Sequence, residues 1–512
     1  MQEDASKLSN KRIAKNTIVL YVRTIFTLFI SLYTSRAILN ILGVENYGIY
    51  NAIGGFVSMF SMISATLVAS TQRYLTYELG RKGSNQSRDV FSVAMMIHLI
   101  LGLVLLLLFE TVGLWFLNAK MNIEPDRMIA ANWVYQCSIF AFLLNIIRSP
   151  YEASIIAHEK MSTFAYVNIL EALLRLVIVF LLLLTIKDKL IIYSVYLTII
   201  SIIIFLLYFF YCKVRFDEAN FYIVKNKELY KGIVGFASYN FLGSVSVVIS
   251  HQCVNVISNL FFGVVVNAAR GITTQVQSAI SKFVNDFSVA LNPQITKSYA
   301  QNNFSNMMSL VYRGAKFSYF LFLFFAIPIV IQAPIVLKLW LKVVPDYTII
   351  FVRLSLIDAL ITTLSNSIST AAMATGDIKK MSIWIGIIRI SVLPFTYLAY
   401  KLGGNPASAY VVLIVFDIIL FFVRLIIADN LIKAKHVDFY KNVIYPVSFV
   451  TFCAVPVCYF IFKFYLVDGL IQLGIYSGIC FFITAFFVFL LGLTKYERTF
   501  VIGYVINKLK RK

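Results

Sequence analysis

The chain has 512 residues, of which 60% are hydrophobic and 13% are charged, and its mean hydropathy is +0.82. This composition excludes a water-soluble enzyme or binding domain and indicates a polytopic membrane protein. The formal charge of +21 does not indicate a nucleic-acid partner, because Lys and Arg are spread over many short polar segments and form no single basic surface interleaved with aromatic residues.

Apolar runs of about 20 residues, the length that crosses a bilayer as a helix, recur along the whole chain. A β-barrel would show short alternating segments instead. The sequence therefore predicts an all-α polytopic membrane protein with about fourteen transmembrane helices. The predicted spans are 16–39, 49–70, 91–117, 128–149, 164–186, 190–212, 233–260, 264–290, 314–334, 347–373, 382–402, 406–428, 446–466 and 470–492.

The first fifteen residues are polar and include Lys7, Lys11, Arg12 and Lys15. The apolar run that follows is full length and has no small-residue cleavage site, which does not fit a removable signal peptide. Most Lys and Arg fall in the segments on the N-terminal side of the membrane. By the positive-inside rule, we expect both termini to be cytoplasmic.

Three short patterns occur twice in the same order and with nearly the same separation. They are Gly43-Val44 with Gly263-Val264, Leu114-Trp115 with Leu339-Trp340, and Lys160-Met161-Ser162 with Lys380-Met381-Ser382. Such a repeat predicts two six-helix lobes related by an axis along the membrane normal, with the substrate between them. We expect an N-terminal lobe at 1–230, a C-terminal lobe at 231–445, and two extra helices with a basic cytoplasmic tail at 446–512.

Arg23, Arg36 and Arg270 lie inside predicted spans and have no acidic residue three or four positions away on the same helix. A charge at bilayer depth costs roughly 2.5 kcal/mol or more, so each needs a partner elsewhere. A guanidinium group presents a planar fork of donors that matches phosphate oxygens. These residues predict a cationic cavity for a phosphate or pyrophosphate. The alternative is that each arginine bonds backbone carbonyls or a distant carboxylate as a structural staple.

Other charges within the predicted spans have simpler explanations. Glu171 with Arg175, and Lys282 with Asp286, are i,i+4 neighbours that can neutralise each other. Arg389 and Arg424 lie near the cytoplasmic boundary, where long side chains can snorkel to water. The sequence favours a structural role for these residues.

Asp286 and Asp358 are candidates for binding a cation or proton that couples to transport, although they are also plausible charge partners for Lys282 and Arg353. The chain has no P-loop, no GxSxG motif and no HExxH motif, so no enzyme activity and no cofactor are expected. None of the six cysteines forms a CxxC pair, and no metal site is predicted.

Several stretches resemble the Wzx-type polysaccharide flippases of the multidrug, oligosaccharidyl-lipid and polysaccharide (MOP) exporter superfamily, over essentially the whole chain. The most specific is the pattern Gly-Val-x-x-Tyr-Gly-x-Tyr that begins at Gly43 and ends at Tyr50. Supporting stretches are Ser35-Arg36-Ala37, Pro150-Tyr151-Glu152-Ala153, Ala157-His158-Glu159-Lys160-Met161 and Leu339-Trp340-Leu341.

The resemblance implies a MATE-like fold with alternating access, and translocation of undecaprenyl-pyrophosphate-linked sugar units across the bacterial inner membrane. It implies a cationic cavity that would fall on Arg23, Arg36, Arg270 and Lys282. The expected partners are the lipid-linked anionic oligosaccharide and membrane lipids, with a polysaccharide polymerase and a chain-length regulator as candidates, and no nucleic acid.

Three alternatives stay open. A lipid II flippase shares the fold and the substrate chemistry. A MATE-type multidrug antiporter shares the fold but needs an acidic or aromatic cavity for cations. A membrane polysaccharide polymerase needs a sizeable extracytoplasmic loop, and the predicted outer loops are short.

Overall fold

The computed structural model describes residues 2–58, 60–81, 86–121, 123–341, 344–432, 436–464, 469–495, 497–499 and 502, so the predicted basic tail lies largely outside the described residues. All regular elements within these residues are helical, which confirms the predicted all-α fold. The α-helices are α1 (Gln2–Ser58), α2 (Ser61–Gly80), α3 (Ser87–Leu108), α4 (Leu114–Lys120), α5 (Met128–Ala157), α6 (Met161–Leu183), α7 (Lys189–Arg215), α8 (Lys227–Phe262), α9 (Val264–Ala300), α10 (Phe304–Ile331), α11 (Ala333–Leu341), α12 (Thr348–Thr375), α13 (Lys379–Lys401), α14 (Ser408–Ile432), α15 (His436–Phe439), α16 (Tyr445–Phe464) and α17 (Leu470–Phe487).

Within the described residues, 12 helical stretches are long and apolar enough to cross a membrane. The helices α2 and α9, near the second and eighth predicted spans, are not among them because polar residues interrupt their apolar runs. The count of about fourteen is therefore approximate. The predicted boundaries 49–70 were wrong, since α1 continues to Ser58 and α2 begins at Ser61. Hydropathy alone does not locate the start of α2, which lies inside an apolar run.

The repeated Gly-Val pattern marks the same backbone break in both halves of the chain. Gly43 and Gly263 both have φ +78°, a conformation that residues with a Cβ atom rarely adopt. A Cβ atom at either position would have no neighbouring atom within 4 Å. Glycine is therefore required for the backbone conformation and not to avoid a steric clash. At Gly43 the break kinks α1, and at Gly263 it separates α8 from α9.

The contacts among residues divide the chain into two compact units. Unit 1 is Met1–Ser244 with Thr296–Asn303, and unit 2 is Val245–Ile295 with Phe304–Lys512. Two of the three divisions fall inside the long helices α8 and α9, and the third lies between α9 and α10. The predicted lobes 1–230, 231–445 and 446–512 remain our proposal for the domain organisation.

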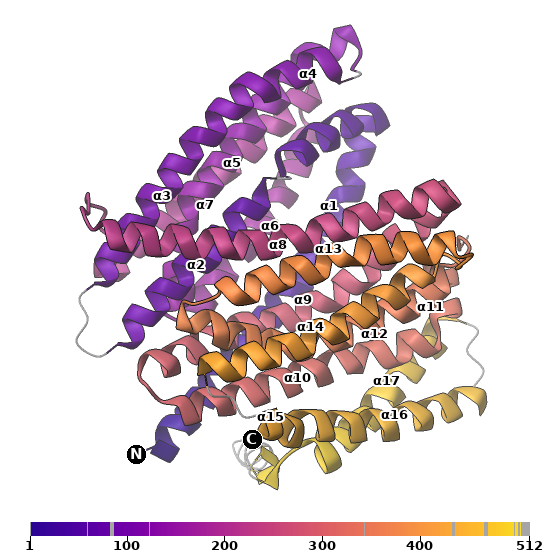
Figure 1. The fold of residues 1–512 in the computed structure, drawn as a ribbon. Coiled ribbons are helices and arrows are strands. Elements are labelled where there is room, and N and C mark those ends of the chain that lie inside the picture. Colours follow the sequence, from indigo (N-terminus) through magenta and orange to yellow (C-terminus); the bar gives the residue numbers. More distant parts are fainter. Residues whose placement is uncertain are drawn as a thin grey trace, which may run out of the picture. The chain divides into compact units, whose positions relative to one another are not determined.

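Within unit 1, α5 is the central helix and packs against α7, α2, α3 and α1 (Figure 1). Its contact residues include the fully buried Val134, Tyr135 and Ile146. The helix α6 packs mainly against α1. Its side chains Val177 and Phe180 are 47% and 54% exposed, and Leu184, directly after the helix, is 81% exposed, as expected for a surface that faces lipid.

Within unit 2, α12 has the corresponding central place and packs against α10 and α14. The C-terminal hairpin of α16 and α17 packs on α10. A buried ion pair joins Lys316 of α10 to Glu497, with Nζ and Oε2 2.7 Å apart. This pair ties the end of the described chain to the core of unit 2.

Glu159, in the turn between α5 and α6, is a buried anion in unit 1. Its backbone has a positive φ of 59°, and its side chain is 2% exposed. Its Oε1 lies 2.5 Å from Nζ of Lys297, at the end of α9, and its Oε2 lies 3.5 Å from Nη1 of Arg12 on α1. Nδ2 of Asn16 donates to its carbonyl oxygen at 3.3 Å. One side chain therefore links three separate segments of unit 1.

We expect Glu159→Gln to destabilise the protein by about 3 kcal/mol, because removing one partner of a buried ion pair leaves the other charge uncompensated. Thermal unfolding of the full chain in detergent measures the effect. The matched control is Glu124→Gln, since Glu124 is exposed. Equal melting temperatures for the Glu159 variant and the parent would contradict the proposed role of this ion pair.

Candidate functional site

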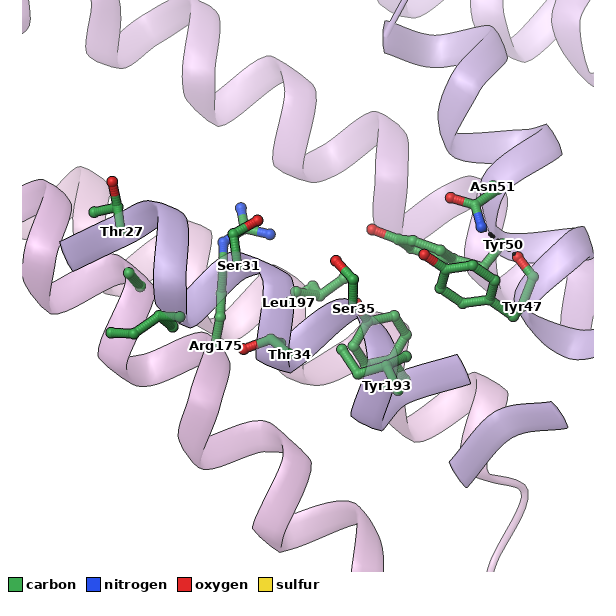
Figure 2. Close-up of a pocket in the computed structure, with 13 residues that line it drawn as sticks. Thr27, Ser31, Thr34, Ser35, Tyr47, Tyr50, Asn51, Arg175, Tyr193 and Leu197 are labelled. Atoms are coloured by element: carbon green, nitrogen blue, oxygen red, sulfur yellow. Dashed lines mark hydrogen bonds between the residues drawn. The ribbon is translucent and has the colours of Figure 1, made fainter. Parts of the chain in front are cut away.

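A polar cavity of about 240 Å³ lies within unit 1 (Figure 2). One wall is a face of α1, before the break at Gly43. The lining residues from this face are Thr27, Ile30, Ser31, Thr34, Ser35 and Ile38. Their spacing of three to four residues is the helical repeat, so they form one continuous stripe of hydroxyl groups and isoleucines.

A second wall comes from α1 after the break. Gly43 redirects the chain, and Tyr47, Tyr50 and Asn51 then line the cavity with helical spacing. The side-chain Nδ2 of Asn51 donates to the carbonyl oxygen of Tyr47 at 2.8 Å. The Tyr-Gly-x-Tyr part of the motif that carries the family resemblance thus supplies aromatic side chains to this site.

The remaining walls come from α6 and α7. Ala172 and Arg175 belong to α6, and Tyr193 and Leu197 belong to α7. The rings of Tyr50 and Tyr193 meet edge to face with centroids 4.9 Å apart, a favourable arrangement for an aromatic pair. Arg175 is the one charged residue among the 13 that line the cavity, and no carboxylate lines it.

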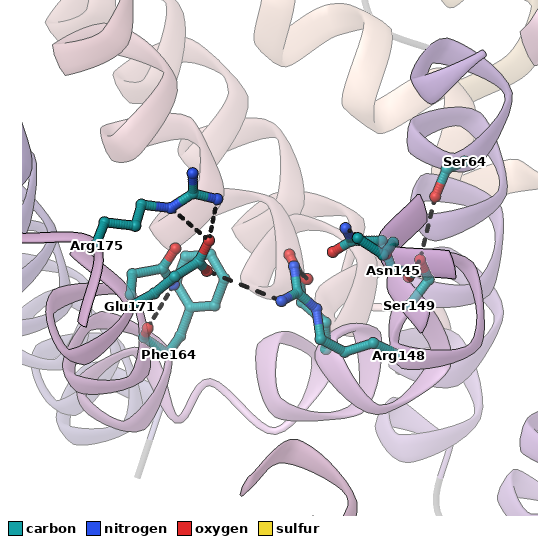
Figure 3. A network of polar contacts seen from close by, with 10 residues as sticks. Ser64, Asn145, Arg148, Ser149, Phe164, Glu171 and Arg175 are labelled. Carbon is teal, nitrogen blue, oxygen red and sulfur yellow. Dashed lines mark hydrogen bonds and ion pairs between the residues drawn. The ribbon is translucent and has the colours of Figure 1, made fainter. Parts of the chain in front are cut away.

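Arg175 is held in place by an ionic network (Figure 3). Its Nη2 and Nε donate to Oε1 of Glu171 at 2.9 and 3.3 Å. The other carboxylate oxygen of Glu171 lies 3.9 Å from Nη1 of Arg148, and Arg148 also pairs with Glu152 at 3.8 Å. Next to this network, the hydroxyl groups of Ser64 and Ser149 are 3.2 Å apart. The predicted i,i+4 pair of Glu171 and Arg175 is confirmed, and it also orients a residue of the cavity.

Arg23, a predicted substrate-binding residue, lies on the same face of α1 as the cavity stripe, about one turn before Thr27. Its Nη2 donates to the hydroxyl group of Thr24 at 3.1 Å, and its guanidinium lies 5.2 Å from the ring centre of Phe164. Arg36 is exposed and lies about two and a half turns beyond Thr27, on the opposite face of the helix. Arg36 therefore does not line this cavity.

Arg270 is buried within unit 2, with 5% exposure. Its Nε donates to Oδ1 of Asn255 at 2.5 Å, and its guanidinium lies 5.0 Å from the ring centre of Tyr410. Its Nη1 is buried without a hydrogen-bond partner among the described residues. Both contacts are with neutral groups. Lys282, also predicted for the cationic cavity, is exposed on α9, while Asp286 is buried.

A second ionic cluster occupies the interior of unit 2. Nη2 of Arg389 lies 2.5 Å from Oδ1 of Asp417, and both side chains are at most 7% exposed. Nη1 of Arg424 donates to the hydroxyl group of Ser365 at 2.6 Å. Asp358 and Asp417 are also buried here, 6% and 3% exposed, with their carboxyl groups close enough to interact.

This cluster corrects two expectations. Arg389 is 6% exposed and does not snorkel to water, because it pairs with the buried Asp417 of α14, and the half-buried Arg424 donates to Ser365 of α12. Asp358 is placed beside Asp417 and not beside Arg353, whose Nε donates to the carbonyl oxygen of Val330 at 2.9 Å. Both errors arise because the partners come from helices distant in the sequence. No group of three or more His, Cys, Asp or Glu within the described residues could hold a metal ion.

Sequence reasoning missed the hydroxyl stripe of α1, and it also missed Arg148 and Tyr193. The stripe has a detectable signal, since Thr27, Ser31 and Thr34 recur with helical spacing on the face that carries Arg23. Tyr193 has no such signal, because it reaches the cavity only through the packing of α7 against α1 and α6.

Comparison with known families gives a match of residues 13–299, more than half of the chain, to the model of a family described as polysaccharide biosynthesis protein. The chain belongs to the polysaccharide biosynthesis protein family. Among curated proteins, no match was found. The chain is thus a multi-pass membrane protein of this family.

Solved structures similar to this member of the family are transporters with low sequence identity. An outward-facing MATE-family multidrug resistance transporter of the MOP superfamily has a TM-score of 0.73 at 13% identity, covering 83% of this chain and 96% of that one. A MATE protein in a bent conformation has a TM-score of 0.74 at 14% identity with the same coverage. A MOP-superfamily transporter from Pyrococcus furiosus, whose binding pocket is described as having reverse polarity, has a TM-score of 0.70 at 14% identity, again covering 83% and 96%. These likenesses show that the fold is MATE-like.

The pair of Arg389 and Asp417 gives a stability prediction for this family member. We expect Arg389→Leu to destabilise unit 2 by about 3 to 5 kcal/mol, because Asp417 would stay buried without its partner. The double variant Arg389→Leu with Asp417→Leu should recover much of the loss, since neither buried charge then remains. A thermal-unfolding double-mutant cycle measures the coupling. Additive effects of the two substitutions would contradict the pairing.

Proposed function

We propose that this protein is a flippase that translocates undecaprenyl-pyrophosphate-linked oligosaccharide units across the bacterial inner membrane by alternating access, for the synthesis of surface polysaccharide. The observation that carries the proposal is the lining of the unit 1 cavity. Seven of its residues bear hydroxyl groups, one bears a guanidinium, and none bears a carboxylate. Such a lining suits a hydroxyl-rich or anionic solute and offers no counter-charge to an organic cation.

The family membership supports a role in polysaccharide synthesis, and the MATE-like fold supports transport as the activity. In this proposal, Arg23, Arg36, Arg270 and Lys282 supply positive charge for the pyrophosphate. Arg270 fits this role best, because a buried guanidinium with only neutral partners has unused capacity for an anion. Two repeat-related lobes that move as bodies would alternate access to the substrate without a nucleotide. The proposal places both termini in the cytoplasm.

The alternatives differ in what they require of the site. A multidrug antiporter requires acidic groups that hold cations, and the unit 1 cavity has none among its lining residues. The similar structure from Pyrococcus furiosus is itself described as having a pocket of reverse polarity that suggests a different function. A lipid II flippase carries the same pyrophosphate on the same lipid, so transport of the two glycans has to be compared directly. A polysaccharide polymerase and a chain-length regulator remain the proposed pathway partners.

Replacing one of the basic residues proposed to bind the pyrophosphate should abolish transport without lowering the amount of protein in the membrane. We expect Arg23→Ala and Arg270→Ala each to abolish surface polysaccharide in a bacterial strain that lacks its own flippase and depends on this one. The lysine substitutions should restore only part of the activity, because lysine keeps the charge but lacks the planar fork of donors. Surface glycan is scored at matched membrane abundance.

The control is Arg215→Ala, because Arg215 is an exposed arginine at the end of α7. It should support the parental amount of surface glycan. Full activity of both alanine variants at Arg23 and Arg270 would remove these residues from the site. Failure of the parent to restore glycan in strains that make several different repeat units would contradict the proposed substrate class.

The ion that drives transport is proposed to bind at Asp286 and Asp358, the buried carboxylates of α9 and α12. We expect Asp286→Asn and Asp358→Asn to make glycan flux in membrane vesicles insensitive to imposed proton and sodium gradients, because an amide neither releases a proton nor balances a cation. Asp346→Asn, which changes an exposed loop residue, should keep the parental dependence. Parental gradient dependence in both carboxylate variants would contradict the assignment.

A further inference from the structure

The cavity of unit 1 contains a polar group that the fold itself leaves unused. The side chain of Thr34 lines the cavity, is 7% exposed as a residue, and its hydroxyl group has no hydrogen-bond partner within the described part of the chain. Some buried hydroxyl groups, such as that of Ser154 on α5, donate to the carbonyl oxygen four residues earlier. Those of Thr17, Thr71 and Thr76 also have no partner among the described residues, and Thr34 differs from them in lining the cavity. A buried hydroxyl without a partner costs about 1 to 3 kcal/mol, so Thr34 is better explained by a ligand that completes it.

Arg175 has a second unused edge. Its bonds to Glu171 employ Nε and Nη2, so among the described residues its Nη1 edge remains for a further acceptor. The side chain is 47% exposed and lines the same cavity as Thr34. Because Glu171 is itself held by Arg148, the guanidinium is oriented before a ligand arrives.

The aromatic wall adds a third feature. The edge-to-face pair of Tyr50 and Tyr193 gives the cavity a rigid apolar surface beside its hydroxyl groups. Such amphipathic rings offer both contact area and hydroxyl groups. The volume of about 240 Å³ is below the usual range of about 300–1,000 Å³ for drug-sized ligands. The cavity therefore suits one small polar unit and not a whole oligosaccharide.

From these observations we infer that the unit 1 cavity is a recognition subsite for a single acidic sugar residue of the transported glycan. The sugar carboxylate accepts from Nη1 of Arg175, a sugar hydroxyl group bonds with Thr34, and the sugar ring packs beside Tyr50 and Tyr193. This inference rests on the proposed function, because it assumes that the transported substrate is a glycan. The subsite is separate from the basic residues proposed to bind the pyrophosphate. It makes Arg175, Thr34 and the two tyrosines specificity-determining residues.

The test is a ligand-observed NMR titration of the full chain in detergent. The probes are glucuronate, galacturonate and N-acetylneuraminate, with glucose and galactose as neutral counterparts and inorganic pyrophosphate as the competing anion. We expect at least one acidic sugar to bind at least about tenfold more tightly than the neutral sugars, because its carboxylate forms a charge-assisted hydrogen bond. Pyrophosphate should not displace it.

Two variants separate binding from folding. Arg175→Gln should weaken binding of the acidic sugar by about tenfold or more, and Thr34→Val should weaken it by about fivefold. Thr34→Val should leave thermal stability equal or slightly higher, because it removes an unsatisfied hydroxyl group. The matched control is Thr17→Val, which removes another buried unpartnered hydroxyl of α1 that does not line the cavity. It should not change binding.

Any one of four results would overturn the inference. The first two are absence of binding by all three acidic sugars and equal binding of acidic and neutral sugars. The others are displacement of the sugar by pyrophosphate and unchanged binding in Thr34→Val and Arg175→Gln. Because the titration uses free sugars and no transport, each of these results leaves the flippase proposal standing. Conversely, a failure of complementation with intact sugar binding would reject transport and keep the subsite.

Discussion

The site in unit 1 depends on one carboxylate placed between two guanidinium groups. Charges are costly at membrane depth, and Glu171 lowers that cost for both Arg175 and Arg148. The same contacts fix Arg175 in a single orientation, with its free edge available to the cavity. In the sequence, the pair of Glu171 and Arg175 suggests only charge neutralisation. In the structure, the same pair also orients Arg175 in the cavity.

The backbone break at Gly43 is the second constraint. Without a positive φ at this position, the tyrosines after it would continue the line of α1 and would not close the cavity. The equivalent break at Gly263 shows that the same device occurs in the other half of the chain, at the start of α9. Gly43 thus connects a short sequence motif to the geometry of the candidate site, and it explains why the motif contains both glycine and tyrosine.

Much of the fold could be predicted from the sequence, because lipid requires long apolar helices and these have a plain hydropathy signal. Helix boundaries were harder to predict where a helix begins inside an apolar run, as α2 does at Ser61. The site was predicted only in part. Arg23 and Arg270 stood out as charges without a local partner, whereas the pairing of Arg389 with Asp417 depends on the packing of α13 against α14, which no local pattern encodes.

The proposed function requires that this chain alone move a lipid-linked anionic glycan across a bilayer. The most direct measurement reconstitutes the purified protein in liposomes that hold a fluorescent polyprenyl-pyrophosphate oligosaccharide, and follows how much of the glycan becomes accessible to a membrane-impermeant glycosidase. If the protein is a flippase, accessible glycan rises from about one half toward completion with the parent protein, and stays at one half in protein-free liposomes. No rise above the protein-free value, for glycans of several compositions and with ion gradients imposed, would contradict the proposed function.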